Sequence, residues 1–155
     1  MTAQGDIAPD FELPDQDGAL HRLSTAKPAP VVLFFYPRDD TSGCTREAQD
    51  FTALARDFAD AGAMVYGISK DTQAKHQKFR EKRDLTVTLL SDAEDMVCES
   101  YGVWAEKKMY GKTFMGIVRT TVLIDGDGRI ARVWPKVKVP GHADEVLQAL
   151  RELSA

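Results

Sequence analysis

The chain has 155 residues, of which 43% are hydrophobic and 28% charged, with a formal net charge of −4 and a pI near 5.4. This length and balance predict one globular domain over residues 1–155. The acidic balance argues against a nucleic-acid partner, because phosphate binding depends on clustered lysine and arginine. No apolar run approaches the roughly 20 residues of a membrane span, so no membrane partner is expected.

The cysteine content and the N-terminal sequence bear on the compartment. Two cysteines far apart in sequence are too few for a disulfide framework. The first residues lack the basic and apolar stretches of a secretory signal. We therefore expect free thiols in a reducing cytoplasm.

In the first half of the chain, strand-like and helix-like segments alternate. Residues 11–23 carry short apolar pieces around a polar turn and predict a hairpin. The continuous apolar run 31–36 predicts a strand that is buried on both faces. From Thr45, apolar residues at helical spacing predict a helix that Gly62 ends, and residues 64–69 predict a second buried strand.

Two further helices and a short extended segment follow. Asp71 is the predicted N-cap of a polar helix that runs to about Arg83, and residues 87–90 are predicted to be extended. Asp92 begins another predicted helix, which Gly102 closes.

The C-terminal part predicts a hairpin and a closing helix. Residues 120–124 and 129–134 flank an Asp-Gly-Asp-Gly turn, and residues 142–153 form an amphipathic helix. The order of elements predicts an α/β thioredoxin-like fold, to which the N-terminal hairpin and an inserted helix are added. This scaffold carries several thiol chemistries, so the fold alone does not decide the function.

Cys44 is the most informative residue, because it follows a strand and lies in the first turn of a predicted helix. Unpaired backbone N–H groups and the positive end of the helix dipole favour the thiolate there, and the thiolate is the reactive form of cysteine. A second possibility is that Cys44 is a small buried residue without chemistry.

Three cysteine chemistries do not fit this position. A Cys-X-X-Cys dithiol is excluded because the third residue after Cys44 is Glu47. A cysteine-dependent phosphatase needs an arginine where the chain has Asp50. A structural metal site is excluded because Cys98 is remote and the three histidines are scattered. A lone thiol beside a hydroxyl and a strand-ending proline remains, and this set suits a peroxide.

Pro37, Thr41 and Cys44 match the Pro-X-X-X-Thr-X-X-Cys motif of the peroxiredoxins. The flanking Phe-Tyr-Pro and Gly-Cys-Thr segments, and most of the remaining chain, resemble the Q-type branch, also called bacterioferritin comigratory proteins. The resemblance implies a thiol peroxidase that reduces hydrogen peroxide and organic hydroperoxides through a sulfenic acid on Cys44. It also implies that Arg119 is the active-site arginine, and that neither cofactor nor metal ion takes part.

Ionisation of the thiol cannot explain a peroxidase by itself. A free thiol gains at most about 30-fold at pH 7 from full ionisation, which is far less than enzymes achieve. Donors that hold the peroxide in line must supply the remainder. The candidates are Arg119, the Thr41 hydroxyl and the backbone N–H groups of Gly43 and Cys44. Thr41 could also act as a helix N-cap, and Pro37 removes one N–H group from the pocket.

The recycling step departs from the relatives that the chain resembles. Many of them carry a resolving cysteine where this chain has Gln49, and others carry it near the position of Arg80. Two routes remain open. Either an external thiol, from thioredoxin or from glutathione and glutaredoxin, reduces Cys44 directly, or Cys98 resolves it. We favour a packed, inert Cys98, and the branch resembled implies a monomer.

Some alternatives concern the whole function or single segments. Cys44 oxidation could be a signal in a non-enzymatic redox-sensing or binding protein. The lysines at 107, 108 and 112 lie among aromatic residues and predict a solvated loop at the rim of the pocket. The histidines are interpreted as surface or capping residues.

Overall fold

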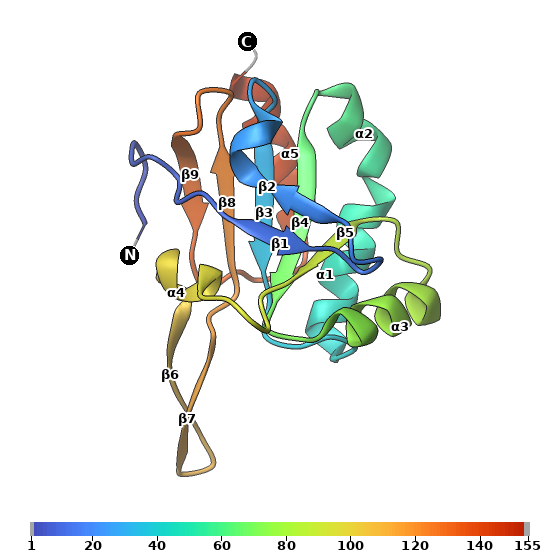
Figure 1. The fold of residues 1–155 in the computed structure, drawn as a ribbon, viewed down its shortest axis with the longest axis vertical. Coiled ribbons are helices and arrows are strands. Elements are labelled where there is room, and N and C mark those ends of the chain that lie inside the picture. The colour runs from blue at the N-terminus through green and yellow to red at the C-terminus, as the bar shows by residue number, and fades with distance from the viewer. Residues whose placement is uncertain (1, 154–155) are drawn as a thin grey trace.

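The computed structural model describes residues 2–153, and a five-stranded mixed sheet forms its centre (Figure 1). The strand order is β5-β4-β3-β8-β9, with β3 parallel to β4 and antiparallel to β8. The strands are β3 (Val31–Phe35), β4 (Met64–Ser69), β5 (Thr88–Ser91), β8 (Thr120–Ile124) and β9 (Ile130–Trp134). All five residues of β3 are buried, as the continuous apolar run predicts.

Side chains of β3 alternate between two core layers, because successive residues of a strand point to opposite faces. Helices cover one face, and their apolar residues pack with Val32 and Phe34. These helices are α1 (Ser42–Ala53), α2 (Ala55–Asp60), α3 (Gln73–Arg83) and α5 (His142–Leu153). The N-terminal segment and a short helix cover the other face, where Leu33 and Phe35 point. This layer contains β1 (Glu12–Pro14), β2 (Leu20–Arg22), the 3₁₀ helix η1 (Leu23–Ala26) and α4 (Val97–Ser100).

Residues 104–117 form a hairpin that extends away from the body, where the sequence predicts a solvated loop (Figure 1). Its strands are β6 (Trp104–Met109) and β7 (Lys112–Ile117). The turn residues Tyr110 and Gly111 both have positive φ, 52° and 76°. Two such residues match the right-handed twist of paired strands, so the turn closes the hairpin. The prediction of a loop is therefore wrong. The sequence did not indicate a hairpin because Tyr-Gly is a less familiar turn than Asn-Gly.

The remaining elements follow the predicted order, with shifts at three helix ends. Helix α3 begins one residue later than predicted: Thr72 is its N-cap and accepts the Lys75 N–H at 3.3 Å. The Asp71 carboxylate does not cap this helix and instead accepts the Ser69 hydroxyl at 2.7 Å. The helix predicted from Thr45 is interrupted at Leu54, which separates α1 from α2.

The helix predicted from Asp92 to Gly102 is much shorter in the structure. The Asp92 carboxylate accepts the N–H groups of Val97 and Cys98 at 3.1 and 2.8 Å. It therefore caps a helix that begins five residues further along the chain, and the intervening residues form turns. Gly102, with φ of 71°, follows the end of this helix as predicted. No helix among residues 2–153 has the length and apolar character needed to cross a bilayer.

Candidate active site

Cys44 is the third residue of α1, directly after the loop that follows β3. Thr45 donates the first intrahelical hydrogen bond, to the Thr41 carbonyl at 2.8 Å. The N–H groups of Gly43 and Cys44 therefore have no intrahelical acceptor and point out of the N-terminus of the helix. The thiol itself is 1% exposed and packs in the helix-covered core layer.

Arg119 lies just before β8, which pairs with β3, and this pairing brings it to the N-terminus of α1. Its Nη2 donates to the Cys44 sulfur at 3.3 Å, and its Nη1 donates to Glu47 Oε1 at 2.7 Å. A Cβ atom at Gly43 would lie 3.2 Å from Nη2, so the glycine leaves room for the guanidinium. The structure thus brings together two predicted residues that are 75 positions apart.

Glu47 is a member of this site that the sequence analysis used only to exclude a dithiol. It lies one helical turn after Cys44 and is 1% exposed. Burial raises the pKa of Glu47 to about 7, although the Arg119 guanidinium opposes this effect. Its Oε2 has no hydrogen-bond partner among the described residues. The spacing of three residues from the cysteine is the signal that could have placed it on the same helix face.

Two cations, Arg119 and Lys107, interact with the thiol from the side of the hairpin. Burial opposes the charge of Arg119, but Glu47 and then Cys44 outweigh it and raise the pKa of the guanidinium. Burial, followed by repulsion from Arg119, lowers the pKa of Lys107 on β6. Lys107 therefore lies within electrostatic reach of the site, which places the hairpin at its rim.

Thr41 and Pro37 lie in the loop before α1, and among the described residues the hydrogen bond to the Cys44 sulfur comes from Arg119. Thr41 occupies the N-cap position of α1, yet its side chain makes no capping bond, and the expectation that it accepts a backbone N–H is wrong. Its hydroxyl instead donates to the Arg38 carbonyl at 3.0 Å. Pro37 is half-buried and follows Tyr36 at the end of β3. Both residues remain close to the thiol along the chain.

Cys98 lies in the core layer on the other face of the sheet from Cys44. Both cysteines are free thiols. Burial, to which the Asp92 carboxylate adds, raises the pKa of Cys98 well above its usual value. At the other position considered for a resolving cysteine, Arg80 donates to the backbone carbonyls of Thr86 and Val87.

The histidine interpretation is wrong for two of the three residues. His76 is fully buried between Asp39 and Leu90, and His142 is 5% exposed and contacts the Thr121 hydroxyl at 2.7 Å. Their polar partners come from other elements, so local sequence carried no signal of their burial. In the part of the chain that the structure describes, no three His, Cys, Asp or Glu side chains gather as metal ligands would.

Residues 4–133 match the AhpC/TSA protein family. A putative peroxiredoxin Bcp of Coxiella burnetii is 49% identical over 94% of this chain and 97% of its own. Peroxiredoxin Bcp of Bacillus subtilis is 47% identical over 97% and 96%. The chain belongs to the peroxiredoxins. Within that family it falls in the Q-type, or Bcp, branch, as the segments that flank the motif predict.

Solved structures of this peroxiredoxin branch have the same fold. The bacterioferritin comigratory protein of Xanthomonas campestris superposes with a TM-score of 0.91, at 37% identity, over 100% of this chain and 99% of its own. A peroxiredoxin Q of Xylella fastidiosa gives a TM-score of 0.93 at 34% identity, with 100% and 99% covered. The predicted thioredoxin-like fold is confirmed. The protein is a thiol-dependent peroxidase, with a peroxide as substrate and a thiol as reductant, which sets aside the non-enzymatic alternative.

Proposed function

We propose that Cys44 is the peroxidatic nucleophile and that Arg119 stabilises the reaction that it carries out. The observation that carries this proposal is the 3.3 Å contact between Arg119 Nη2 and the Cys44 sulfur at the N-terminus of α1. The thiolate attacks one peroxide oxygen, an S–O bond forms and the O–O bond breaks. The sulfur is oxidised to a sulfenic acid, and the other oxygen leaves as water or an alcohol after it takes up a proton.

The donors around the sulfur suit the charge that develops during this step. Negative charge moves onto the departing oxygen as the O–O bond lengthens, and preorganised donors stabilise it most in a buried site. Arg119 and the free N–H groups of Gly43 and Cys44 have this role in the proposal. The Thr41 hydroxyl donates to a backbone carbonyl, so its oxygen keeps lone pairs that can accept the O–H of the peroxide. Pro37 contributes by having no N–H group there.

The substrates in this proposal are hydrogen peroxide and organic hydroperoxides. The alkyl peroxide reduction described for the Xanthomonas campestris protein supports the second class. The reductant is an external thiol, from thioredoxin or from glutathione and glutaredoxin. Its first thiol attacks the sulfenic sulfur and releases water, and a second thiol then releases Cys44 from the mixed disulfide.

The same chemistry bears on the compartment in which the enzyme works and on its oligomeric state. Two free thiols and a thiol reductant suit a reducing, cytoplasmic compartment. We propose that the active form is a monomer, because Cys44, Glu47 and Arg119 all come from one chain. Sedimentation of the reduced protein across a wide concentration range tests this point, and a mass that rises with concentration contradicts it.

The assignment of Cys44 is tested with Cys44→Ser, which we expect to abolish peroxide reduction and leave the fold unchanged. Peroxide consumption in stopped flow with a thiol donor is the measurement, and circular dichroism checks folding. Cys98→Ala is the matched control, because it removes the other thiol and keeps Cys44. Retention of more than a few per cent of the wild-type rate in Cys44→Ser would overturn the assignment.

A further inference from the structure

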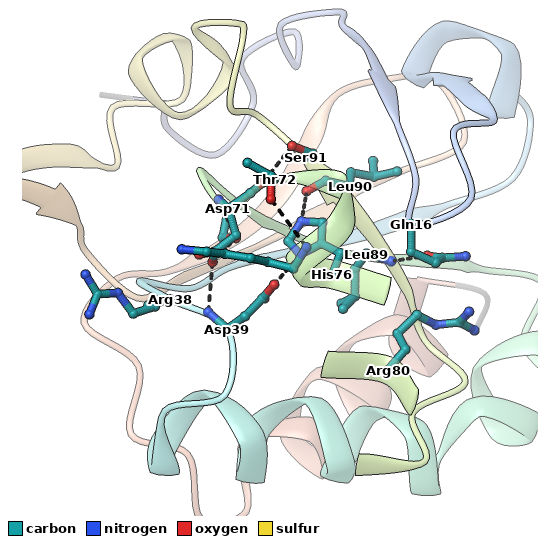
Figure 2. Close-up of polar contacts among 12 residues, drawn as sticks. Gln16, Arg38, Asp39, Asp71, Thr72, His76, Arg80, Leu89, Leu90 and Ser91 are labelled. Carbon is teal, nitrogen blue, oxygen red and sulfur yellow. Dashed lines mark hydrogen bonds and ion pairs between the residues drawn. The ribbon is translucent and has the colours of Figure 1, made fainter. Parts of the chain in front are cut away.

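Residues 37–41, which join β3 to α1, are held in place by a cluster of buried polar side chains (Figure 2). Asp39, in the middle of this loop, is fixed at three points. Its Oδ1 accepts the Tyr36 hydroxyl at 2.6 Å, its Oδ2 lies 2.6 Å from His76 Nδ1, and its own N–H donates to Asp71 Oδ2 at 2.8 Å. Three directions of contact leave the loop little freedom.

His76 connects this loop to the central sheet. The ring is fully buried on α3, and its Nε2 lies 2.9 Å from the carbonyl oxygen of Leu90 on β5. A carbonyl oxygen only accepts, so Nε2 carries a hydrogen toward Leu90, and the other ring nitrogen, Nδ1, makes the contact with the Asp39 carboxyl group. The imidazole thus bridges the catalytic loop to β5 through two hydrogen bonds.

The groups that surround this bridge are also satisfied. Asp71 accepts the Ser69 hydroxyl at 2.7 Å, and the Ser91 hydroxyl donates to the Asp71 carbonyl at 2.6 Å. A displacement of the loop would leave several buried polar groups without partners, which is costly. The exposed ion pairs from Asp40 to Lys82 and Arg83 also join the loop to α3, but contacts of this kind contribute little.

We propose that His76 is a positioning residue for the peroxide step. Through Asp39, His76 fixes the loop that carries Pro37 and Thr41 and leads into α1. It thereby sets the position of Cys44 relative to Arg119. His76 touches neither the sulfur nor Arg119 and acts only through the loop. The proposal rests on the assignment of Cys44 as the reactive thiol.

The clamp of Tyr36, Asp39 and His76 acts differently on the two halves of the cycle. Oxidation needs the closed loop, because in-line attack depends on the position of the sulfur to within about 1 Å. Reduction by a protein thiol needs an open loop, because Cys44 is 1% exposed and must become accessible to that thiol. A weakened clamp therefore slows oxidation of Cys44 and does not slow its reduction.

Two substitutions of the same residue separate the clamp from mere packing. In His76→Asn, the amide nitrogen takes the place of Nδ1 and keeps a donor toward Asp39. In His76→Gln, the amide nitrogen takes the place of Nε2 and keeps the bond to Leu90, but the contact with Asp39 is lost. We expect Cys44 oxidation by hydrogen peroxide to slow about tenfold or more in His76→Gln. It should stay within about threefold of wild type in His76→Asn.

The chain also contains a matched control. In the N-terminal hairpin, His21 Nε2 lies 2.7 Å from Asp15 Oδ2, and His21 Nδ1 lies 3.3 Å from the Tyr66 hydroxyl. This Tyr-His-Asp group has the same three residue types, but it does not contact residues 37–41. Here Nε2 makes the contact with the carboxylate, so His21→Asn is the substitution that loses it. We expect His21→Asn to oxidise and to recycle at wild-type rates.

Stopped-flow oxidation by hydrogen peroxide and single-turnover reduction of preoxidised protein by reduced thioredoxin give the two rates separately. The proposal is supported if Cys44 oxidises more slowly in His76→Gln and its oxidation is partly restored in His76→Asn. Reduction of preoxidised His76→Gln should also be at least as fast as that of the wild type. The proposal is overturned if His76→Gln oxidises normally, if its two rates fall by the same factor, or if His21→Asn shows the same slowing. Tyr36→Phe removes only the hydroxyl on Asp39 and is expected to slow oxidation about threefold, so it decides the matter if the His76 variants do not fold. Total inactivity of Cys44→Ser remains a separate test of the nucleophile.

Discussion

At the scale of single residues, the site is organised by the two nitrogens that Arg119 directs at different partners. One donates to the Cys44 sulfur, and the other forms a 2.7 Å ion pair with Glu47. The same guanidinium therefore contacts both the sulfur of Cys44 and a buried carboxyl group. The Glu47 side chain fixes the orientation of Arg119, and its ionisation partly neutralises the charge that faces the sulfur.

Arg119→Ala is expected to slow the peroxide step by about 10²-fold, as the loss of a donor to developing charge typically does. If Arg119 acted mainly by ionising the thiol, raising the pH would restore the rate. We therefore expect the defect to persist at pH 9 in stopped-flow measurements. Arg132→Ala, an exposed arginine on β9, is the control and should be unaffected. Full recovery of Arg119→Ala at pH 9 is the outcome that contradicts this role.

Glu47 predicts a specific dependence of stability on pH. Its pKa is about 7 in the folded protein and 4.5 in the reference state, so between these values the folded protein keeps a proton that the unfolded chain has lost. Stability therefore falls as the pH rises from about 4.5 to about 7, by about 3 kcal/mol at most. Glu47→Gln should lack this part of the decline.

The measurement is the free energy of unfolding in urea at pH 5 and at pH 8, for the wild type and the variant. The difference between the two proteins isolates the contribution of Glu47 from that of the other titrating groups. Glu81→Gln, at an exposed position on α3, is the control and should follow the wild type. Parallel declines in the wild type and Glu47→Gln would show that burial does not hold the proton.

At the scale of elements, the β6–β7 hairpin depends on its two-residue turn. Tyr110 has φ of 52° and is 97% exposed, so it adopts a left-handed conformation without packing that compensates for it. Asparagine adopts this conformation more readily, and Asn-Gly is the preferred pair for such a turn. We expect Tyr110→Asn to raise the Tm by about 1–3 °C, which corresponds to less than about 1 kcal/mol.

The opposite change supplies the comparison for this turn. Tyr110→Val places a β-branched side chain at positive φ and should lower the Tm. Thermal unfolding followed by circular dichroism measures both variants. A Tm that moves in the same direction in the two variants would mean that backbone conformation does not limit the hairpin.

Elements with a strong local pattern could be predicted from the sequence, and elements defined by distant contacts could not. Strand β4 and helix α5 have the predicted bounds, because apolar periodicity and a glycine before or after them mark their ends. Helix α4 is short because the Asp92 carboxylate reaches forward to Val97 and Cys98, a choice that the sequence does not reveal. The β6–β7 hairpin was missed for a different reason: its strands pair locally, but Tyr-Gly is a less familiar hairpin turn than Asn-Gly.

At the scale of the whole molecule, the central sheet separates the two thiols. Cys44 packs with the helical layer and Cys98 with the layer of the N-terminal hairpin. A disulfide requires Cα atoms within about 7 Å, so pairing across the sheet would need a large rearrangement. The sequence left two routes open, a one-cysteine cycle and resolution by Cys98. This arrangement favours the one-cysteine cycle.

Cys98→Ala is accordingly expected to keep peroxide turnover within about twofold of wild type, because its thiol is buried and held in the protonated form by its surroundings. Intact mass spectrometry after one equivalent of peroxide, with a sulfenic-acid trap, should find the adduct on Cys44 and a free Cys98. A loss of two hydrogens that maps to a Cys44–Cys98 peptide would establish the other route.

The candidate site shows the same division between local and distant information. The motif predicts Cys44, Thr41 and Pro37 because they lie within eight residues, and the family resemblance adds Arg119. Glu47 and His76 were missed because their importance arises from partners 72 and 37 positions away. Burial of a charged or ionisable side chain is decided by the packing of the whole chain.

The enclosure of Cys44 also decides how the enzyme responds to excess substrate. In the one-cysteine cycle that we propose, no intramolecular thiol ends the sulfenic state, so its lifetime depends on opening of the loop and on the supply of external thiol. A second peroxide is small and competes by the route that the first one used, and the sulfinic acid that it forms is not recovered by ordinary thiols. The concentration of peroxide that the enzyme tolerates therefore depends on the concentration of thiol reductant around it.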